Sequence, residues 1–279
     1  MVVQIGTLLQ IAPRYDAIIL DQWGVLHDGT TPYPAAQSAL AQLHKAGVRL
    51  AVLSNSGKRA ALNAARIESM GFAPEWFELV MTSGEALWQD IQTRAVTDRV
   101  FFPIEAASGD ALSWSDGIEV AFTSEMSRAD AVLLMGLGDA GHAHRALDEA
   151  LARALPVYCT NPDRASPRAG GVTVPSPGAL AHAYAAAGGT VRFYGKPHLA
   201  VFRAIERALG VAPNRLLMVG DSLEHDIAGA AAAGWHSALI EGGLHRATFA
   251  ASEDAPASLQ ALCHETGFPL PDFTLSTLR

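Results

Sequence analysis

Short apolar runs that alternate with longer alanine-rich stretches limit the fold of this chain more than any other feature. Each run is continuous, without polar residues at every second position, as expected for strands that helices cover on both faces. The runs are Ala17–Leu20, Val48–Leu53, Leu79–Met81, Val100–Phe102, Ala131–Met135, Val157–Cys159, Val191–Tyr194, Leu216–Val219 and Ser237–Ile240. Their alternation with helical stretches predicts βα units and a mostly parallel sheet.

The stretches between the runs carry helix stop signals. Residues 35–46 are followed by Gly47, and residues 59–70 by Gly71, which are typical positions for a glycine that ends a helix. Residues 143–154 form the clearest helical pattern in the middle of the chain. The segment from Pro162 to Gly178 contains four prolines and three glycines, which predicts a loop.

Composition excludes several classes of protein. Hydrophobic residues make up 49% of the chain and charged residues 17%, which is not the composition of a disordered protein. A net charge of −8 without a cluster of Lys and Arg argues against nucleic acid or a membrane surface as partner. Cys159 and Cys263 fit neither a metal site nor a disulfide framework. With no signal peptide recognised at Met1–Pro13, we expect a cytoplasmic protein.

Polar residues with related chemistry follow several of the predicted strands. They are Asp21, Ser54, Lys196 and Asp221, with Asp226 shortly after Asp221. In parallel sheets, functional groups gather at the carboxyl ends of strands. Carboxylates hold Mg²⁺, whereas hydroxyl and ammonium groups bind phosphate oxygens. A carboxylate that attacks phosphorus would form a phosphoryl-aspartate intermediate.

Four motifs in this order resemble the haloacid dehalogenase-like (HAD) superfamily. They are Leu20–Leu26 (LDQWGVL), Leu53–Ser56 (LSNS), Gly195–Pro197 (GKP) and Val219–Ile227 (VGDSLEHDI). Their spacing is similar to that of class IIA members, the NagD-type and p-nitrophenylphosphatase-like phosphatases. Thr160–Asp163 and Pro177–Leu180 are similar to cap signatures of the same class.

The resemblance implies an α/β fold with two parts. We expect a Rossmann-like, doubly wound parallel-sheet core at 1–83 and 191–279, interrupted by a smaller α/β cap domain of the C2 type at 84–190. The resemblance further implies an Mg²⁺-dependent hydrolase, a phosphatase for a small phosphorylated metabolite such as a sugar phosphate or a nucleotide-like compound. It also suggests a homodimer formed through the cap.

The resemblance assigns a role to each candidate site residue. Asp21 would be the nucleophile, Ser54, Asn55 and Lys196 would hold the phosphoryl group, and Lys196 would offset the charge of Asp21. Mg²⁺ would be held by Asp21, the Trp23 backbone carbonyl and Asp221, with Asp226 as a further ligand or as an orienting group acting through water. In the cap, the residues expected to face the substrate are Asn161, Asp163, Arg164 and Arg168.

Trp23 departs from the pattern of the phosphatases in this superfamily. The residue two positions after the nucleophile is usually an aspartate that acts as general acid and base, and an indole cannot take that role. His27 and Asp28 are alternative proton carriers on the turn that follows.

Two other functions stay open because of Trp23. One is cleavage of a C–P or C–halogen bond. The acidic pair Asp221 and Asp226 argues against metal-free dehalogenation, and residues 84–190 contain no lysine for a Schiff base. The other is a protein that binds phosphorylated metabolites with little or no turnover.

Overall fold

The computed structural model describes residues 2–167, 173–251 and 254–279, and the chain divides into two compact units. The first unit consists of Met1–Ser54, Ala64–Met81 and Phe202–Arg279, and the second of Asn55–Asn63 and Thr82–Val201. The chain therefore leaves the first unit twice, first for residues 55–63 and then for residues 82–201, and returns to it each time.

A seven-stranded sheet forms the centre of the first unit. In spatial order its strands are β1 (Val3–Gln4), β14 (Phe273–Leu275), β13 (His236–Ile240), β12 (Leu216–Gly220), β2 (Ala17–Leu20), β3 (Leu50–Ser54) and β4 (Leu79–Thr82). β12 pairs in parallel with β13 and β2, and β2 pairs in parallel with β3. The carboxyl ends of these strands therefore lie at the same edge of the sheet.

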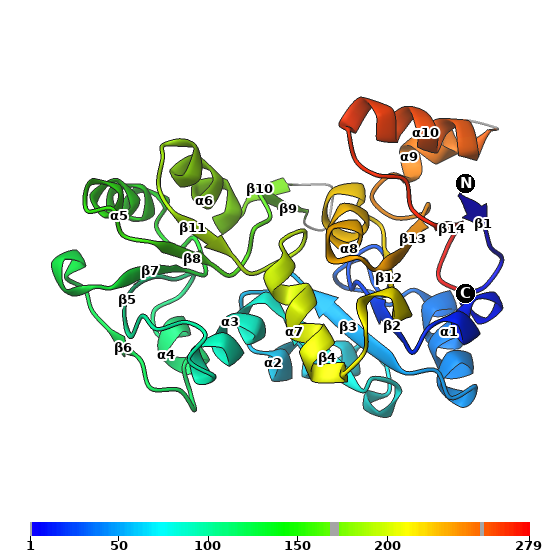
Figure 1. The fold of residues 1–279 in the computed structure, drawn as a ribbon, viewed down its shortest axis with the longest axis horizontal. Helices are drawn as coiled ribbons and strands as arrows, with labels where there is room; N and C mark the ends of the chain where they lie inside the picture. The colour runs from blue at the N-terminus through cyan, green and yellow to red at the C-terminus, as the bar shows by residue number, and fades with distance from the viewer. Residues whose placement is uncertain (1, 168–172, 252–253) are drawn as a thin grey trace. The chain divides into compact units, whose positions relative to one another are not determined.

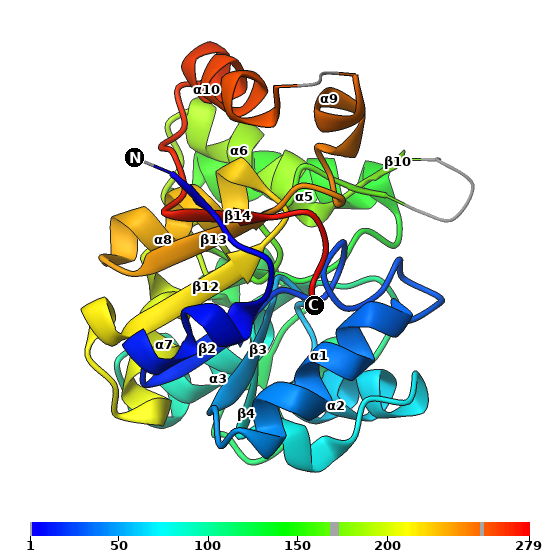
Figure 2. The same ribbon diagram turned by 90° about the vertical axis from the view of Figure 1, so that its right-hand side faces the viewer.

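Helices cover both faces of this sheet. α1 (Pro34–Lys45) and α8 (Ala228–Ala233) lie on opposite sides of it (Figure 2). The other helices that lie wholly or partly in this unit are α2 (Ala60–Ser69), α7 (Leu199–Leu209), α9 (Arg246–Ala250) and α10 (Ala255–Thr266). Pro34 stands at the first position of α1, where its missing N–H costs nothing, and Gly47 follows the helix with a φ of +76°.

The continuous apolar run of β2 is explained by this double cover. Ile18 and Leu20 pack in one cluster with Leu40 of α1. Ile19 is equally buried but stands outside that cluster, because successive side chains of a strand point to opposite faces. Both faces of the strand therefore need apolar side chains.

The second unit has its own α/β core. Its five-stranded sheet has the spatial order β11 (Val191–Phe193), β8 (Val157–Cys159), β7 (Ala131–Leu134), β5 (Val100–Ile104) and β6 (Ala121–Phe122). All neighbouring pairs in this sheet are parallel. Figure 1 shows α5 (Ala140–Ala152) and α6 (Pro177–Ala186) on one side, and α3 (Ser83–Gln92) and α4 (Asp110–Trp114) on the other.

The predicted fold class, α/β with a Rossmann-like parallel-sheet core, is confirmed. The domain bounds 1–83 with 191–279 and 84–190, and the C2 type of the cap, stay predictions. Within the described residues, no helix has both the length and the apolar character needed to cross a membrane.

The interpretation of 162–178 as a loop is wrong in part. β9 (Ala165–Pro167) and β10 (Thr173–Pro175) pair in antiparallel fashion within it, and α6 begins at Pro177. The two strands are short and contain prolines, which are rare inside strands, so the local sequence gives no signal for their pairing.

The C-terminal segment contributes a strand for which the sequence held no motif. In β14, Phe273 pairs with Ala238 and Leu275 with Ile240 of β13, and Phe273 also pairs with Val3 of β1. The side chains of this strand are buried. This segment is therefore part of the core of the first unit.

We expect Leu275→Ala to lower the free energy of unfolding by about 2–5 kcal/mol, because it removes a fully buried side chain from the core. Urea denaturation measures this difference. The matched control is Leu270→Ala, because Leu270 precedes the strand and is 47% exposed, and it should change the free energy by less than about 0.5 kcal/mol. Equal losses in the two variants would contradict the assignment of β14 to the core.

Candidate active site

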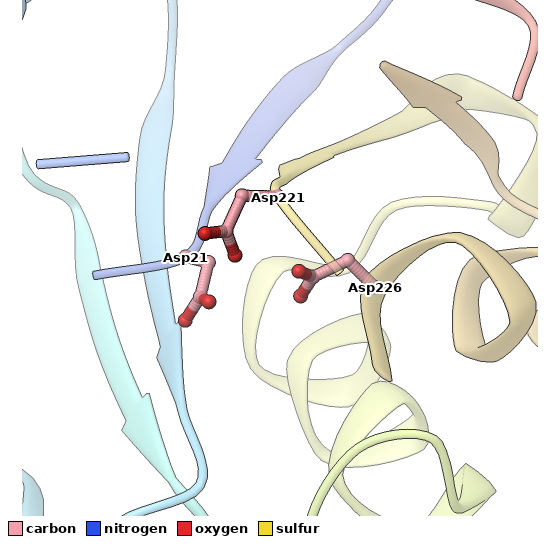
Figure 3. Close-up of side chains that lie close together, drawn as sticks. All are labelled: Asp21, Asp221 and Asp226. Carbon is pink, nitrogen blue, oxygen red and sulfur yellow. The ribbon is translucent and has the colours of Figure 1, made fainter. Parts of the chain in front are cut away.

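Three carboxylates meet in the first unit. One oxygen each of Asp21, Asp221 and Asp226 lies within 4.8 Å of the others. Asp21 and Asp221 stand just past the ends of β2 and β12, and Asp226 lies on the helical turn beyond (Figure 3). Asp226 is fully buried, Asp221 is 9% exposed and Asp21 is partly exposed. Asp21 is thus the member of the cluster most open to a substrate.

Strand register explains why residues distant in the sequence meet here. Leu20 pairs with Val219 of β12 on one side and with Val52 of β3 on the other. Asp21, Asp221 and Ser54 therefore stand at the ends of three adjacent parallel strands, at one edge of the sheet. Ser54 is the last residue of β3 and is partly exposed.

A single turn of π-helix, Leu223–Ile227, carries Asp226 to the cluster. The Ser222 hydroxyl caps this turn by accepting a hydrogen bond from the His225 N–H at 3.1 Å. The Asp226 carboxylate accepts one from the Ser222 N–H at 3.0 Å. The extra residue of a π-turn changes the direction in which its side chains point, and such turns are frequent at functional sites. Here it aims Asp226 back toward β12.

Glycines leave room for the carboxylates. A Cβ at Gly24 would lie 1.7 Å from Asp221 Oδ2, and one at Gly243 would lie 2.3 Å from Asp221 Cβ. A Cβ at Gly220 would lie 2.1 Å from Asp226 Cγ. The backbone thus packs directly on these two side chains and leaves them few other positions.

The chemistry of this donor set fits a hard divalent cation. Carboxylate oxygens are the ligands that Mg²⁺ takes from proteins, usually one or two of them together with waters. Backbone donors also hold the cluster in place. The Gln22 N–H donates to Asp21 Oδ1 at 2.7 Å, and the Leu244 N–H donates to Asp221 Oδ2 at 2.8 Å. The residues present can therefore hold the predicted Mg²⁺.

The loop after Asp21 is tightly folded. The Gln22 carbonyl accepts hydrogen bonds from the N–H groups of Leu26 and His27 at 2.8 and 3.2 Å. The Trp23 indole lies on the backbone of Gly29, where a Cβ would come within 2.0 Å of the ring, and packs edge-on against the His27 ring with centroids 5.9 Å apart. Glycine is therefore favoured at position 29 because a Cβ would clash with the Trp23 ring. Its φ of +99° favours glycine as well, because residues with a Cβ rarely adopt it.

His27 and Asp28, the alternative proton carriers, have different environments. His27 is fully buried, and its Nδ1 accepts a hydrogen bond from the Gly29 N–H at 3.0 Å. Burial lowers the pKa of His27 to about 4. Asp28 is exposed, and hydrogen bonds from Thr31 and Thr30 lower the pKa of its carboxyl group. At neutral pH neither side chain carries a proton that it readily releases.

Three other predicted site residues meet within the second unit. The Asn55 side chain accepts a hydrogen bond from the Lys196 N–H at 2.7 Å and donates to the Lys196 carbonyl at 3.0 Å. It also donates to Asp163 Oδ1 at 2.6 Å. Asn55 thus joins the start of the second unit to Lys196, whose side chain is buried. The phosphate contacts predicted for Asn55 and Lys196 stay predictions.

The remaining candidates of the second unit differ in exposure. Asn161 is partly buried, and its side chain accepts a hydrogen bond from the Asp163 N–H at 3.0 Å. Arg164 is exposed. Arg168 lies outside the described residues. The substrate contacts of Asn161, Asp163 and Arg164 stay predictions, as does the role of the Trp23 carbonyl.

Sequence reasoning missed the roles of the residues that support the acidic cluster, although two of them lie within the first and fourth motifs. Gly24, Ser222 and Gly243 act through their backbone or through a cap, and their roles are visible only once the strands are placed. Gly24 and Asp221 lie in the first and the last third of the chain. Spacing alone therefore gives no sign that the glycine directly after Trp23 contacts this carboxylate.

Two models of known protein families match this chain, one in its first half and one in its second half. A family model described as haloacid dehalogenase-like hydrolase matches residues 18–113, and one described as HAD-hydrolase-like matches residues 193–261. The first match contains Asp21 and Ser54, and the second contains Lys196 and both Asp221 and Asp226.

Relatives and solved structures cover most of the chain. A hydrolase of the haloacid dehalogenase-like family from Brucella suis 1330 is 30% identical, with a TM-score of 0.78 over 99% of this chain and 100% of that chain. Chronophin from Bos taurus is 29% identical over 80% of this chain and 79% of its own length. The p-nitrophenyl phosphatase from Archaeoglobus fulgidus is 22% identical, with a TM-score of 0.74 over 94% of this chain and 96% of that chain, and at this identity it shows the fold alone.

We expect Gly24→Ala to weaken Mg²⁺ binding by at least about tenfold, because the new Cβ would displace the Asp221 carboxylate. Isothermal titration calorimetry with Mg²⁺ measures the affinity. The matched control is Gly47→Ala. Gly47 has a similar φ of +76°, but a Cβ there meets nothing within 4 Å. If both variants bind Mg²⁺ equally well, the contact with Asp221 does not matter for the cation.

We expect the free energy of unfolding to rise with pH between about 4 and 6.5, because His27 binds a proton in the unfolded chain over this range and stays neutral in the folded protein. The difference between the pKa of His27 in the unfolded chain and in the folded protein corresponds to about 3 kcal/mol in the free energy of unfolding. Urea denaturation across this range measures the slope. His27→Gln should reduce it, and an unchanged slope in this variant would rule out His27 as its source.

Proposed function

Since this chain belongs to the haloacid dehalogenase-like family of hydrolases, we propose that it is a Mg²⁺-dependent phosphatase for a small phosphorylated metabolite, a sugar phosphate or a nucleotide-like compound. The observation that carries this proposal is the cluster of Asp21, Asp221 and Asp226 at the carboxyl end of a parallel sheet. The resemblance to the haloacid dehalogenase-like superfamily is confirmed, and p-nitrophenylphosphatases of class IIA share the fold, whereas the type of cap stays a prediction.

Asp21 is the proposed nucleophile. It is the most exposed carboxylate of the cluster, and its Oδ1 is held by the Gln22 N–H. In the first step an Asp21 oxygen forms a bond to phosphorus while the bond from phosphorus to the leaving-group oxygen breaks. In the second step a water oxygen attacks phosphorus, and the bond to Asp21 breaks, which releases phosphate and restores the carboxylate.

Asp221 and Asp226 are the proposed partners of Asp21 in holding Mg²⁺, with the Trp23 carbonyl as a further ligand. When bound, the cation offsets negative charge on the phosphoryl group and on the carboxylates. Asp221 is fixed by the Leu244 N–H and Asp226 by the Ser222 N–H, so both carboxylates are oriented before a cation arrives. This preorganisation supports the assignment.

Ser54 and Lys196 are the proposed phosphoryl-binding residues, with Asn55 as a further donor. Ser54 ends the strand next to β2, which supports a position beside Asp21. The Asn55 side chain holds the Lys196 peptide through two hydrogen bonds and so positions that residue. Asn161, Asp163 and Arg164 are the proposed substrate contacts of the second unit.

Trp23 favours a second candidate function, a protein that binds a phosphorylated metabolite with little turnover. The packed indole occupies the loop next to the nucleophile and cannot act as a general acid or base. Cytoplasmic location, a homodimer and the lack of nucleic-acid partners are further proposals that rest on the sequence.

We expect phosphate release from p-nitrophenyl phosphate to require both Mg²⁺ and Asp21. Chelation of the cation should abolish turnover, and added Mg²⁺ should restore it. Asp21→Asn should lower kcat by at least about 10³-fold, because the nucleophile is lost.

The matched control is Asp28→Asn, a carboxylate on the same loop but outside the cluster, which should keep turnover. Turnover that survives Asp21→Asn would contradict the nucleophile assignment. Binding of Mg²⁺ and phosphate without turnover of any phosphate ester would favour the second candidate function.

A further inference from the structure

The Trp23 side chain is tightly packed within the loop that follows the nucleophile. Its indole lies on Gly29, at a position where any Cβ would come within 2.0 Å of the ring. His27 packs edge-on against the same indole, and the Gly24 N–H donates to the His27 carbonyl at 3.0 Å. The Arg66 side chain donates to the Gly29 carbonyl at 2.6 Å and so holds the loop from another side. The loop therefore presents an indole two residues after Asp21.

His27 and Asp28, the two other candidate proton carriers of this loop, are held in environments that do not suit proton donation. His27 accepts the Gly29 N–H on Nδ1, so its ring proton lies on Nε2, and this atom is buried without a hydrogen-bond partner among the described residues. Asp28 Oδ1 accepts hydrogen bonds from Thr30 and Thr31, which stabilises the ionised carboxylate. An indole N–H is a hydrogen-bond donor but does not release its proton.

Proton transfer matters only for some phosphate compounds. An alkoxide is a strong base, and it leaves phosphorus readily only when a proton reaches it as the bond breaks. General acid catalysis of this kind contributes typically about 10²–10⁴-fold. A carboxylate or a phenolate is a weaker base and leaves as a stable anion without a proton. With no proton supplied by Trp23, His27 or Asp28, the basicity of the leaving group decides which phosphates react.

We propose that Trp23 restricts this site to phosphates whose leaving group departs as a stable anion, such as an acyl phosphate or an aryl phosphate, in preference to alkyl phosphates. This proposal rests on the proposed phosphatase function and narrows its substrate class, because sugar phosphates and nucleotide-like compounds have alkoxide leaving groups and would react slowly here. Trp23 is the residue that sets the specificity, because its indole N–H does not release its proton.

The bonds and protons balance without a general acid. The Asp21 oxygen bonds to phosphorus, and the electron pair of the broken P–O bond leaves with the carboxylate or phenolate. Water then attacks phosphorus, and the electron pair of the bond to Asp21 returns to the carboxylate. Both protons of that water end on the released phosphate, so an acyl phosphate dianion and water give a carboxylate and dihydrogen phosphate.

The deciding experiment compares substrates by the basicity of their leaving groups. Wild-type protein with Mg²⁺ is assayed on acetyl phosphate, p-nitrophenyl phosphate, phenyl phosphate and glycerol phosphate. We expect glycerol phosphate to have the lowest kcat/KM of the four, at least about 10²-fold below p-nitrophenyl phosphate, and phenyl phosphate to lie between these two. If kcat/KM is higher for acetyl phosphate than for p-nitrophenyl phosphate, acyl phosphates are the preferred substrates. If it is higher for p-nitrophenyl phosphate, aryl phosphates are preferred.

Variants of Trp23 test the role of this residue. In Trp23→Asp, the ratio of kcat/KM for glycerol phosphate to that for p-nitrophenyl phosphate should rise by at least about tenfold. In Trp23→Phe, which keeps an aromatic ring, the ratio should stay as in the wild type. The ratio does not depend on the fraction of folded protein, so a purely structural effect leaves it unchanged. An unchanged ratio in Trp23→Asp would overturn the role of Trp23.

Failure of this proposal and failure of the phosphatase function give different results. Equal kcat/KM for glycerol phosphate and p-nitrophenyl phosphate, both lost in Asp21→Asn, would overturn the leaving-group preference and leave the phosphatase intact. Absence of Asp21-dependent turnover on all four compounds would overturn both.

Discussion

Mutual repulsion among three carboxylates is the constraint on which the structure around the site depends. If all are ionised, a pair at such a distance repels by on the order of 3 kcal/mol at an effective dielectric constant of about 20. Asp21, Asp221 and Asp226 nevertheless each place an oxygen within 4.8 Å of the others. The fold provides N–H donors to each of them and close-packed glycines around two of them. A divalent cation is the natural counter-charge for such an arrangement.

The loop after Asp21 is held mainly by backbone hydrogen bonds and by the packing of Trp23. Trp23 is accommodated by Gly29, and the His27 ring completes the packing of the indole. The hydrogen bonds around Gln22 and Gly24 involve backbone groups and do not require a particular side chain at position 23. Proton chemistry can therefore change at this position while the nucleophile keeps its place.

Much of the fold was predictable because the strands are buried on both faces and therefore leave continuous apolar runs. β2 matches its predicted run, and β12 and β13 differ from theirs by one residue. β14 was not predictable, because three residues near the end of the chain carry no periodic signal and pair only with distant strands. The β9–β10 pair was hidden for a related reason, because its short strands lie within a segment rich in proline and glycine.

The sequence by itself determined which chemical groups stand at the strand ends, since Asp21, Ser54 and Asp221 come at the close of continuous apolar runs and parallel strands place such residues at one edge. Only the tertiary structure decided how these groups are held. The contact of Gly24 with Asp221, the π-turn that aims Asp226 and the packing of Trp23 on Gly29 all depend on backbone direction and close approach. Those properties arise when the folded backbone brings its segments together, and residue spacing does not encode them.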